Sequence, residues 1–176
     1  MIRIYFGKSG AGKDFYKKKA VEEEGLLPII AFTSRPMREG EVDGKDYNFT
    51  NKFGFNSLIE NHQLVEWREY KTKKNGVPDV WYYGTPVVDP NEDWVAVMTI
   101  SGIKDYIKHY GPDKINPIYV YADYEVREKA AMERGGFDCI EWERRAKADD
   151  EDFSDYEIHS LEDLLSSQIE VIVNNR

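Results

Sequence analysis

The sequence has 176 residues, a length that suits one compact domain, and its 41% hydrophobic and 32% charged residues exclude a disordered chain. Acidic residues outnumber basic ones by 33 to 24, and the net charge of −9 argues against partners such as nucleic-acid polymers and anionic membranes. The single cysteine, Cys139, excludes an internal disulfide framework and fits a reducing compartment, so we expect a cytoplasmic protein.

The N-terminal segment predicts a unit of strand, loop, helix and strand. Residues 2–6 are mostly apolar, as in a buried parallel strand, and glycines then interrupt the run. Residues 13–24 predict a helix that ends at Gly25, and residues 28–33 predict a second strand. This order is typical of a βαβ unit and therefore predicts an α/β fold with a parallel sheet.

Residues 34–85 differ in character and predict a small antiparallel lobe inserted into this core. Short strands are expected at 47–49, 65–70 and 80–84, with a helix at 56–61. Residues 71–79 predict a hairpin loop with Asn75-Gly76 at its turn.

The remainder returns to alternating strands and helices. Strands are expected at 94–100, 115–121 and 170–174, and helices at 102–110, 124–134 and 138–148. Gly135-Gly136 between the last two helices is a candidate hinge. The acidic run 149–152 predicts a solvated loop.

A phosphate-binding loop is expected between the first strand and the first helix. Residues 7–13 read Gly-Lys-Ser-Gly-Ala-Gly-Lys and fit the pattern GxxxxGK. Glycines let successive backbone N–H groups point at a phosphate, and the helix dipole and Lys13 add positive charge. A glycine-rich turn with a surface lysine is the alternative, which the combination of strand, spacing and helix disfavours. The predicted ATP-binding residues here are Gly7, Ser9, Gly10, Ala11, Gly12, Lys13 and Asp14.

Asp14 departs from the pattern, which has serine or threonine after the lysine as a ligand of Mg²⁺. A carboxylate is also a good ligand for a hard cation, so Asp14 is a candidate Mg²⁺ ligand, directly or through water. The alternative is that Asp14 caps the helix and the metal is held elsewhere.

A second anion site is expected in the run 33–49. Arg35 and Arg38 flank a proline-restrained segment and can converge on one phosphate as bidentate donors. Gly40 and Gly44 let the chain fold back so that Tyr47 reaches the same anion. For the arginines alone, an exposed basic turn would be the alternative.

The run 33–49 closely resembles the monophosphate-binding signature of guanylate kinases. Residues 65–67, 82–85 and 171–174 also resemble that family, in the family's order, and with the phosphate loop the resemblance extends over residues 1–175. It implies a three-layer P-loop core of residues 1–33, 86–122 and 156–176. It further implies a nucleoside-monophosphate (NMP) binding lobe at 34–85 and a helical lid at 123–155.

The resemblance also implies an activity, namely direct in-line transfer of a phosphoryl group from ATP to GMP or dGMP, with Mg²⁺ as cofactor. The implied partners are these small nucleotides, in a monomer or a homodimer. The implied GMP-binding residues are Arg35, Arg38, Tyr47, Glu66, Tyr83, Thr85 and Thr99. Glu66 would face the guanine edge, because a carboxylate accepts from the N1–H and N2–H₂ donors that adenine does not offer together.

Three further residues are assigned through the resemblance. Arg134 and Arg145 match lid arginines and, with Lys13, would stabilise charge on the transferred phosphoryl group. Closure of the lid would also exclude water and limit hydrolysis of ATP. Asn174 matches the adenine-side residue of the family.

Several positions depart from the family and keep other functions open. Ala130 replaces a lid arginine, Val97 and Thr99 replace acidic residues, and Ala31 replaces a serine near the base. The loop 71–79 is also longer than usual. The alternatives are a related kinase with another nucleotide or a phosphorylated ribose as acceptor, and a non-catalytic module that binds phosphorylated peptides. Retention of Glu66 favours guanine, and retention of Lys13 favours a kinase.

Overall fold

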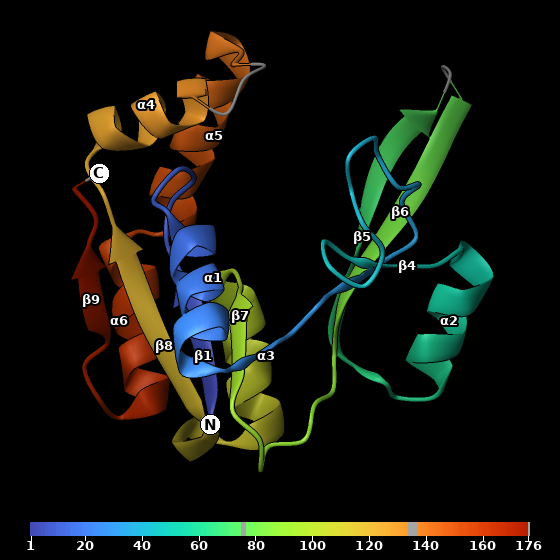
Figure 1. Ribbon diagram of the computed structural model, residues 1–176, viewed down its shortest axis with the longest axis horizontal. Helices are drawn as coiled ribbons and strands as arrows, with labels where there is room; N and C mark the ends of the chain where they lie inside the picture. Colours follow the sequence, from blue (N-terminus) through green and yellow to red (C-terminus); the bar gives the residue numbers. More distant parts are fainter. Residues whose placement is uncertain (75–76, 134–136, 176) are drawn as a thin grey trace. The chain divides into compact units, whose positions relative to one another are not determined.

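The computed structural model describes residues 1–74, 77–133 and 137–175, and these form two compact units. The first unit combines Met1–Pro28 with Pro90–Arg176, and the second is the continuous segment Ile29–Asp89 (Figure 1). The predicted lobe, 34–85, lies within the second unit.

A five-stranded parallel sheet forms the centre of the first unit, in the order β2-β7-β1-β8-β9. Its strands are β1 (Ile2–Phe6), β2 (Leu27–Pro28), β7 (Trp94–Val97), β8 (Ile115–Tyr121) and β9 (Glu170–Val173). The apolar side chains of Ile2, Ile4 and Phe6 on the central strand are fully buried. The predicted α/β class with a parallel sheet is therefore confirmed.

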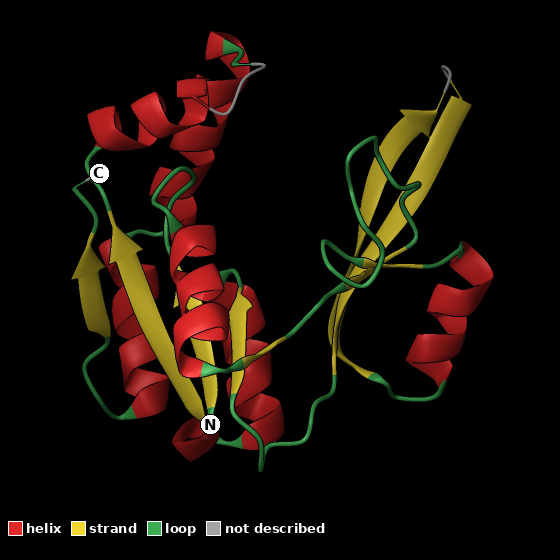
Figure 2. Cartoon of the chain, viewed as in Figure 1, coloured by secondary structure: helices red, strands yellow, loops and turns green. Residues whose placement is uncertain are grey.

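Helices cover both faces of this sheet and give three layers (Figure 2). They are α1 (Lys13–Glu24), α3 (Ile100–Tyr110), α4 (Tyr124–Glu133), α5 (Cys139–Asp152) and α6 (Asp155–Leu165), with a short 3₁₀ turn, η1 (Pro112–Lys114). Helix α1 lies on one face, while α3 and α6 pack side by side on the other. Helix α6, which the sequence analysis did not predict, contributes the fully buried Leu161. No helix in the described ranges is long and apolar enough to cross a membrane.

The second unit is a four-stranded sheet, in the order β4-β3-β6-β5, with one helix. Its elements are β3 (Phe32–Thr33), β4 (Asn48–Phe49), α2 (Lys52–Glu60), β5 (Leu64–Lys74) and β6 (Val77–Pro86). The β3–β6 and β5–β6 pairs are antiparallel as expected, whereas β3 and β4 pair in parallel. The expectation of a purely antiparallel lobe is therefore wrong for this edge.

The predicted hairpin loop at 71–79 is also wrong, because β5 and β6 extend into it. Lys71 pairs with Val80 and Lys74 pairs with Val77, so the ladder runs on through most of that segment. The predicted turn, Asn75-Gly76, lies outside the described residues.

Other boundaries differ for identifiable reasons. Residues 28–33 do not form one strand, because β2 pairs with β7 in the first unit while β3 pairs in the second. Strand β7 ends at Val97 because Thr99 caps α3, its Oγ1 accepting from the Gly102 N–H at 3.2 Å. Similarly, α2 begins at Lys52 because the Asn51 side chain accepts from the Gly54 N–H at 2.8 Å.

Two glycines with similar backbone angles give a test of local packing. Gly10 has φ +78°, and a Cβ there would lie 2.6 Å from the Arg127 carbonyl oxygen. Gly25 has φ +75°, and no described atom lies within 4 Å of the same added carbon. We expect Gly25→Ala to lower the free energy of unfolding by about 1 kcal/mol, which is the cost of the left-handed conformation alone. Gly10→Ala should cost clearly more, because the backbone of α4 must also shift.

Urea unfolding of both variants measures the difference. Equal losses of stability would show that the loop does not pack tightly against α4.

Candidate functional site

The loop between β1 and α1 has the backbone conformation expected of a phosphate cradle. Gly7, Gly10 and Gly12 all have positive φ, at 142°, 78° and 93°. The Lys13 ammonium donates to the carbonyl oxygens of Gly7 and Lys8, at 2.8 and 2.9 Å. The lysine thus folds back across the loop, and its charge lies where phosphate oxygens would meet the N–H groups at the start of α1.

The loop is enclosed by the carboxyl ends of two strands and by α4. A Cβ on Gly7 would collide with the Val120 carbonyl group, and one on Gly12 would lie 2.6 Å from Nδ2 of Asn174. Asn174 is buried and donates from Nδ2 to the Ala11 carbonyl oxygen at 3.1 Å. This residue, predicted on the adenine side, therefore braces the loop directly.

A buried polar cluster that the sequence analysis missed holds the other side of the loop. We call Ser9, Arg127 and Asp149 the loop cluster. The Asp149 carboxylate accepts from the Ser9 N–H at 2.7 Å and from the Ser9 hydroxyl at 3.2 Å. Arg127 Nη1 lies 3.5 Å from Asp149 Oδ2 and donates to the Ser9 carbonyl oxygen at 3.3 Å. The cluster joins the loop to both α4 and α5.

Arg127 is 4% exposed and lies against two aromatic rings. Its guanidinium carbon is 5.6 Å from the ring centre of Tyr124 and 5.9 Å from that of Trp142. Trp142 Nε1 in turn donates to the Tyr124 hydroxyl at 2.9 Å. Within the described residues, Nε of Arg127 is buried without a hydrogen-bond partner. The carboxylate of Asp149 is therefore the main group that compensates the buried positive charge of Arg127.

The expectation of a solvated loop at 149–152 is wrong, because these residues form the last turn of α5. Trp142, Ala146 and Asp149 follow the spacing i, i+4 and i+7, and all three are buried. This spacing in the sequence could have predicted a buried helix face. It was missed because a charged residue such as Asp149 is expected at the surface. The neighbouring Asp150 pairs with Lys8 at 2.5 Å, and this ammonium holds the pKa of the Asp150 carboxyl below its ordinary value.

The lid arginines were predicted at Arg134 and Arg145, and Arg134 lies outside the described residues. Arg145 is exposed on α5 and donates from Nε to Glu141 Oε1 at 3.0 Å. Arg144 binds the same carboxylate through two bonds of 2.8 Å, and together the two arginines lower the pKa of Glu141 to about 2. Arg145 is thus held along its own helix, and no described bond joins it to the phosphate loop.

Asp14 is exposed in the first turn of α1. The N-cap of this helix is Gly12, and no side-chain cap bond is formed in the described structure, so the capping alternative for Asp14 finds no support. No group of three metal-ligating side chains occurs among the described residues. Magnesium is commonly held by one or two carboxylates with water and substrate phosphates, so a single carboxylate beside the loop fits this ion.

The second unit contains the predicted monophosphate residues. Arg35 is buried and binds Glu41 through two bonds, at 2.9 and 2.7 Å. Glu41 also accepts from the Arg38 N–H at 2.7 Å. The hydrogen-bonded pair raises the pKa of Arg35 and lowers the pKa of Glu41. Glu41, which the sequence analysis did not single out, therefore fixes the segment between the two arginines.

The structure brings Arg35, Arg38, Tyr47 and Tyr83 together. The guanidinium of Arg35 lies 5.5 Å from the ring centre of Tyr47, whose ring lies 6.0 Å from that of Tyr83. Arg38, Tyr47 and Tyr83 also line one open cavity of about 660 Å³, which we call the acceptor groove. Its other lining residues are Arg68, Glu69, Tyr70, Thr72 and Trp81.

Glu66 and Thr85 form a separate pair on the same sheet. They lie opposite each other in the β5–β6 ladder, and the Thr85 hydroxyl donates to Glu66 Oε1 at 2.5 Å. This bond orients the carboxylate that was predicted to face guanine. Thr99, by contrast, belongs to the first unit, where its hydroxyl caps α3.

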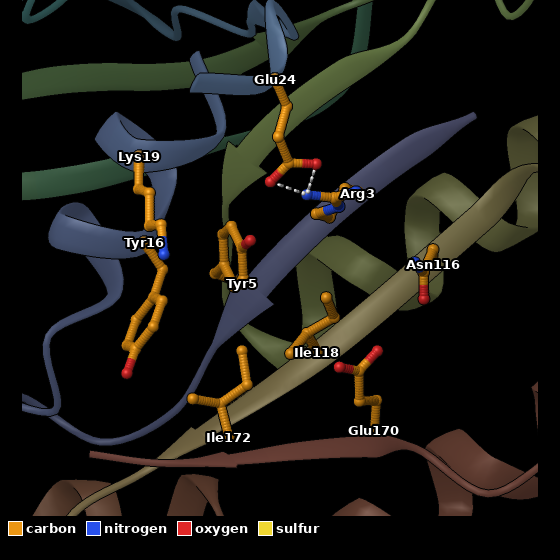
Figure 3. A pocket seen from close by; sticks show the side chains of 9 residues that line it. All are labelled: Arg3, Tyr5, Tyr16, Lys19, Glu24, Asn116, Ile118, Glu170 and Ile172. Carbon is orange, nitrogen blue, oxygen red and sulfur yellow. Dashed lines mark hydrogen bonds and ion pairs between the residues drawn. The ribbon is translucent and has the colours of Figure 1, made fainter. Parts of the chain in front are cut away.

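A different cavity of about 330 Å³ lies on the sheet of the first unit beside α1 (Figure 3). Its arginine, Arg3, already binds both carboxylate oxygens of Glu24, at 2.9 and 2.8 Å. This cavity contains no residue of the phosphate loop and none of the predicted site residues. The glycine loop and the acceptor groove, which contain predicted site residues, are therefore better candidates for the functional site than this cavity.

The loop cluster gives a prediction about stability. Asp149→Ala leaves Arg127 buried without its carboxylate, so the free energy of unfolding should fall by about 3 kcal/mol. The double variant Arg127→Met/Asp149→Ala should recover most of this loss, because no uncompensated charge remains. Chemical denaturation measures both effects.

Asp152→Ala is the matched control, since Asp152 is an exposed carboxylate on the same helix. It should change stability by less than about 0.5 kcal/mol. Additive losses in the double variant would contradict a direct Arg127–Asp149 interaction.

Comparison with known proteins finds similarity to guanylate kinases. The family model described as guanylate kinase matches residues 2–84. A curated guanylate kinase from Lactococcus lactis subsp. lactis is 36% identical over 142 residues, covering 77% of this chain and 65% of the relative. The chain thus spans slightly less than two thirds of that relative's length.

Among solved structures, the crystal structure of guanylate kinase from Anaplasma phagocytophilum is similar, with a TM-score of 0.59 at 18% identity. The match covers 100% of this chain and 77% of that one. At this identity the likeness shows the fold alone.

Proposed function

Because the chain is similar to guanylate kinases, we propose that it belongs to their family and catalyses transfer of a phosphoryl group from ATP to GMP or dGMP. The observation that carries the proposal is that the described part of each unit contains a cluster of groups whose chemistry suits binding of an anion. The first has the glycine loop with Lys13, and the second has two arginines and two tyrosines beside an oriented carboxylate. Phosphoryl transfer needs positioning and positive charge rather than a covalent intermediate, and these groups supply both.

On the donor side, the N–H groups of residues 7–13 and the Lys13 ammonium would bind the β- and γ-phosphates of ATP. Lys13 would exchange its bonds to the Gly7 and Lys8 carbonyl oxygens for phosphate oxygens. Asn174 and the loop cluster would hold the loop in the required conformation before ATP binds. Arg145 and Arg134 would add charge to the transferred group.

On the acceptor side, Arg35, Arg38, Tyr47 and Tyr83 would bind the phosphate of GMP. The Glu66 carboxylate, fixed by Thr85, would accept from N1–H and N2–H₂ of guanine. A phosphate oxygen of GMP would then attack the γ-phosphorus in line. The new P–O bond would form while the bond from the γ-phosphorus to the β–γ bridging oxygen breaks, and ADP would depart with that oxygen. Thr99 remains assigned to the guanine side.

We assign Asp14 to Mg²⁺, whose chemistry when bound is to neutralise charge on the phosphates of ATP. We also place the reaction in the cytoplasm, where the free and exposed thiol of Cys139 stays reduced.

The same contacts disfavour two other functions. A different nucleotide or a phosphorylated ribose as acceptor would use the same arginine cluster, but the Glu66–Thr85 pair favours guanine. A module that binds phosphorylated peptides has no use for Lys13 or for a braced glycine loop. Both features support a kinase.

A coupled ADP-release assay with GMP, dGMP, AMP, UMP and CMP tests the proposal. GMP and dGMP should give the highest rates, and Lys13→Ala should lower kcat at least about 100-fold because charge stabilisation at the phosphates is lost. Lys18→Ala, an exposed lysine on the same helix, should leave the rate unchanged. No ADP above the ATP-only background with any acceptor would contradict a kinase.

The metal assignment has its own test. Asp14→Asn should raise the Mg²⁺ concentration needed for half-maximal rate several-fold, because one anionic ligand is lost. Glu23→Gln, which removes an exposed carboxylate from the same helix, is the control. A Mg²⁺ titration in which Asp14→Asn matches the wild type would remove this role.

A further inference from the structure

The acceptor groove extends along the β5–β6 ladder beyond Tyr83. Arg68 lies directly opposite Tyr83, and Tyr70 lies opposite Trp81. Side chains alternate between the faces of a strand, so these four residues project from the same face. Directly opposite residues have Cβ atoms about 5 Å apart, which places Arg68 beside one of the predicted phosphate residues. All four residues line the groove together with Arg38.

The charges around the groove are incompletely balanced. Arg35 is neutralised by its two bonds to Glu41, so it brings little net charge to a bound anion. Arg38 and Arg68 are exposed, and within the described residues neither guanidinium forms a hydrogen bond or an ion pair. Arg38 acts on Glu41 and Tyr47 only through its longer-range charge. A nucleotide monophosphate carries close to two negative charges at neutral pH, by analogy with other phosphate monoesters. Two unpaired guanidinium groups on one groove match this charge.

Glu69 also lines the groove, but its position in the strand places its Cβ on the opposite face of the sheet to that of Arg68. Its partner in the ladder is Tyr82, which stacks on Phe55 with ring centres 5.4 Å apart. Residues 69 and 82 therefore start from the opposite face of the sheet to Arg68 and Tyr83. Glu69 nevertheless lines the groove, so it adds one negative charge to a lining that also contains Arg38 and Arg68.

An aromatic pair bounds the groove beyond Arg68. The rings of Tyr70 and Trp81 stack with centres 6.2 Å apart and planes at 26°. An apolar wall next to a guanidinium displaces water and strengthens the interaction of that guanidinium with a phosphate. Both residues of this wall lie in segments that the sequence had predicted as strands, just outside the expected loop at 71–79.

From these observations we propose that Arg68 is a third arginine for the acceptor's phosphate, beside Arg35 and Arg38. The inference rests on the proposed function and adds a specificity-determining residue to it. Arg68 would donate to the phosphate oxygens across from Tyr83, with the planar geometry that favours bidentate binding of phosphate. The groove would thereby select a doubly charged phosphate monoester over the uncharged nucleoside.

Calorimetric titration of GMP and of guanosine, without ATP, tests this role. Arg68→Gln should weaken GMP binding about 10-fold, since charge-assisted hydrogen bonds to phosphate are lost. Its affinity for guanosine should stay at the wild-type value, because guanosine has no phosphate. Arg68→Lys keeps the charge but loses the planar guanidinium that binds phosphate through two bonds. Its affinity for GMP should therefore lie between those of Arg68→Gln and the wild type.

Lys71→Gln is the matched control, because it removes the same charge from the same strand at an exposed position that starts from the other face. It should leave both affinities unchanged. Equal weakening of GMP and guanosine by Arg68→Gln would indicate a packing role and overturn the inference. Wild-type affinity for GMP in Arg68→Gln would also overturn it while leaving the kinase proposal intact. Absence of GMP binding by the wild type would instead remove both.

Discussion

Close packing around the glycine loop, by backbone at Gly7 and Gly10 and by the Asn174 side chain at Gly12, is the constraint on which the first unit depends. Gly7 meets the end of β8, Gly10 meets the first turn of α4, and Gly12 meets the residue after β9, each at a distance that leaves no room for a Cβ. The N–H groups of the loop can converge on an anion only while these contacts hold. The proposed phosphate site therefore depends on the strand ends and the helix start that surround the loop as well as on the loop sequence.

Carboxylates fix the positive groups of both units. Asp149 compensates Arg127 behind the loop, Glu41 binds Arg35 in the second unit, and Glu141 holds Arg145 along α5. Groups held in place by internal partners need little rearrangement when a charged ligand arrives, and such preorganisation favours transfer of charged groups. Arg35 and Arg127 are buried, so their carboxylates also prevent the cost of an unpaired charge.

The sequence predicted the elements whose signals are local. The strand at Ile2–Phe6, the helix at Lys13–Glu24 and the strand at Ile115–Tyr121 have the expected bounds, because apolar runs and glycine stops define them. The parallel pairing of β3 with β4 and the length of the β5–β6 hairpin depend on partners far along the chain.

The residue types in the sequence were enough to name candidate anion-binding residues, but not to name the buried partners that hold them in place. The chemistry of the arginines and glycines indicated where anions would bind. The partners Glu41 and Asp149 were missed, because a carboxylate is expected at the surface unless a buried cation, visible only in three dimensions, requires it.

We propose that the two units bind different nucleotides, ATP at the glycine loop and the acceptor at the arginine cluster. Backbone amide chemical shifts, measured by NMR during separate titrations with a non-hydrolysable ATP analogue and with GMP, test this most directly. We expect the ATP analogue to shift the amides of residues 7–14, and GMP to shift those of residues 35–47 and 66–85. If both ligands shifted only one of these sets, or if GMP left the arginine segment unchanged, the two units would not bind different nucleotides.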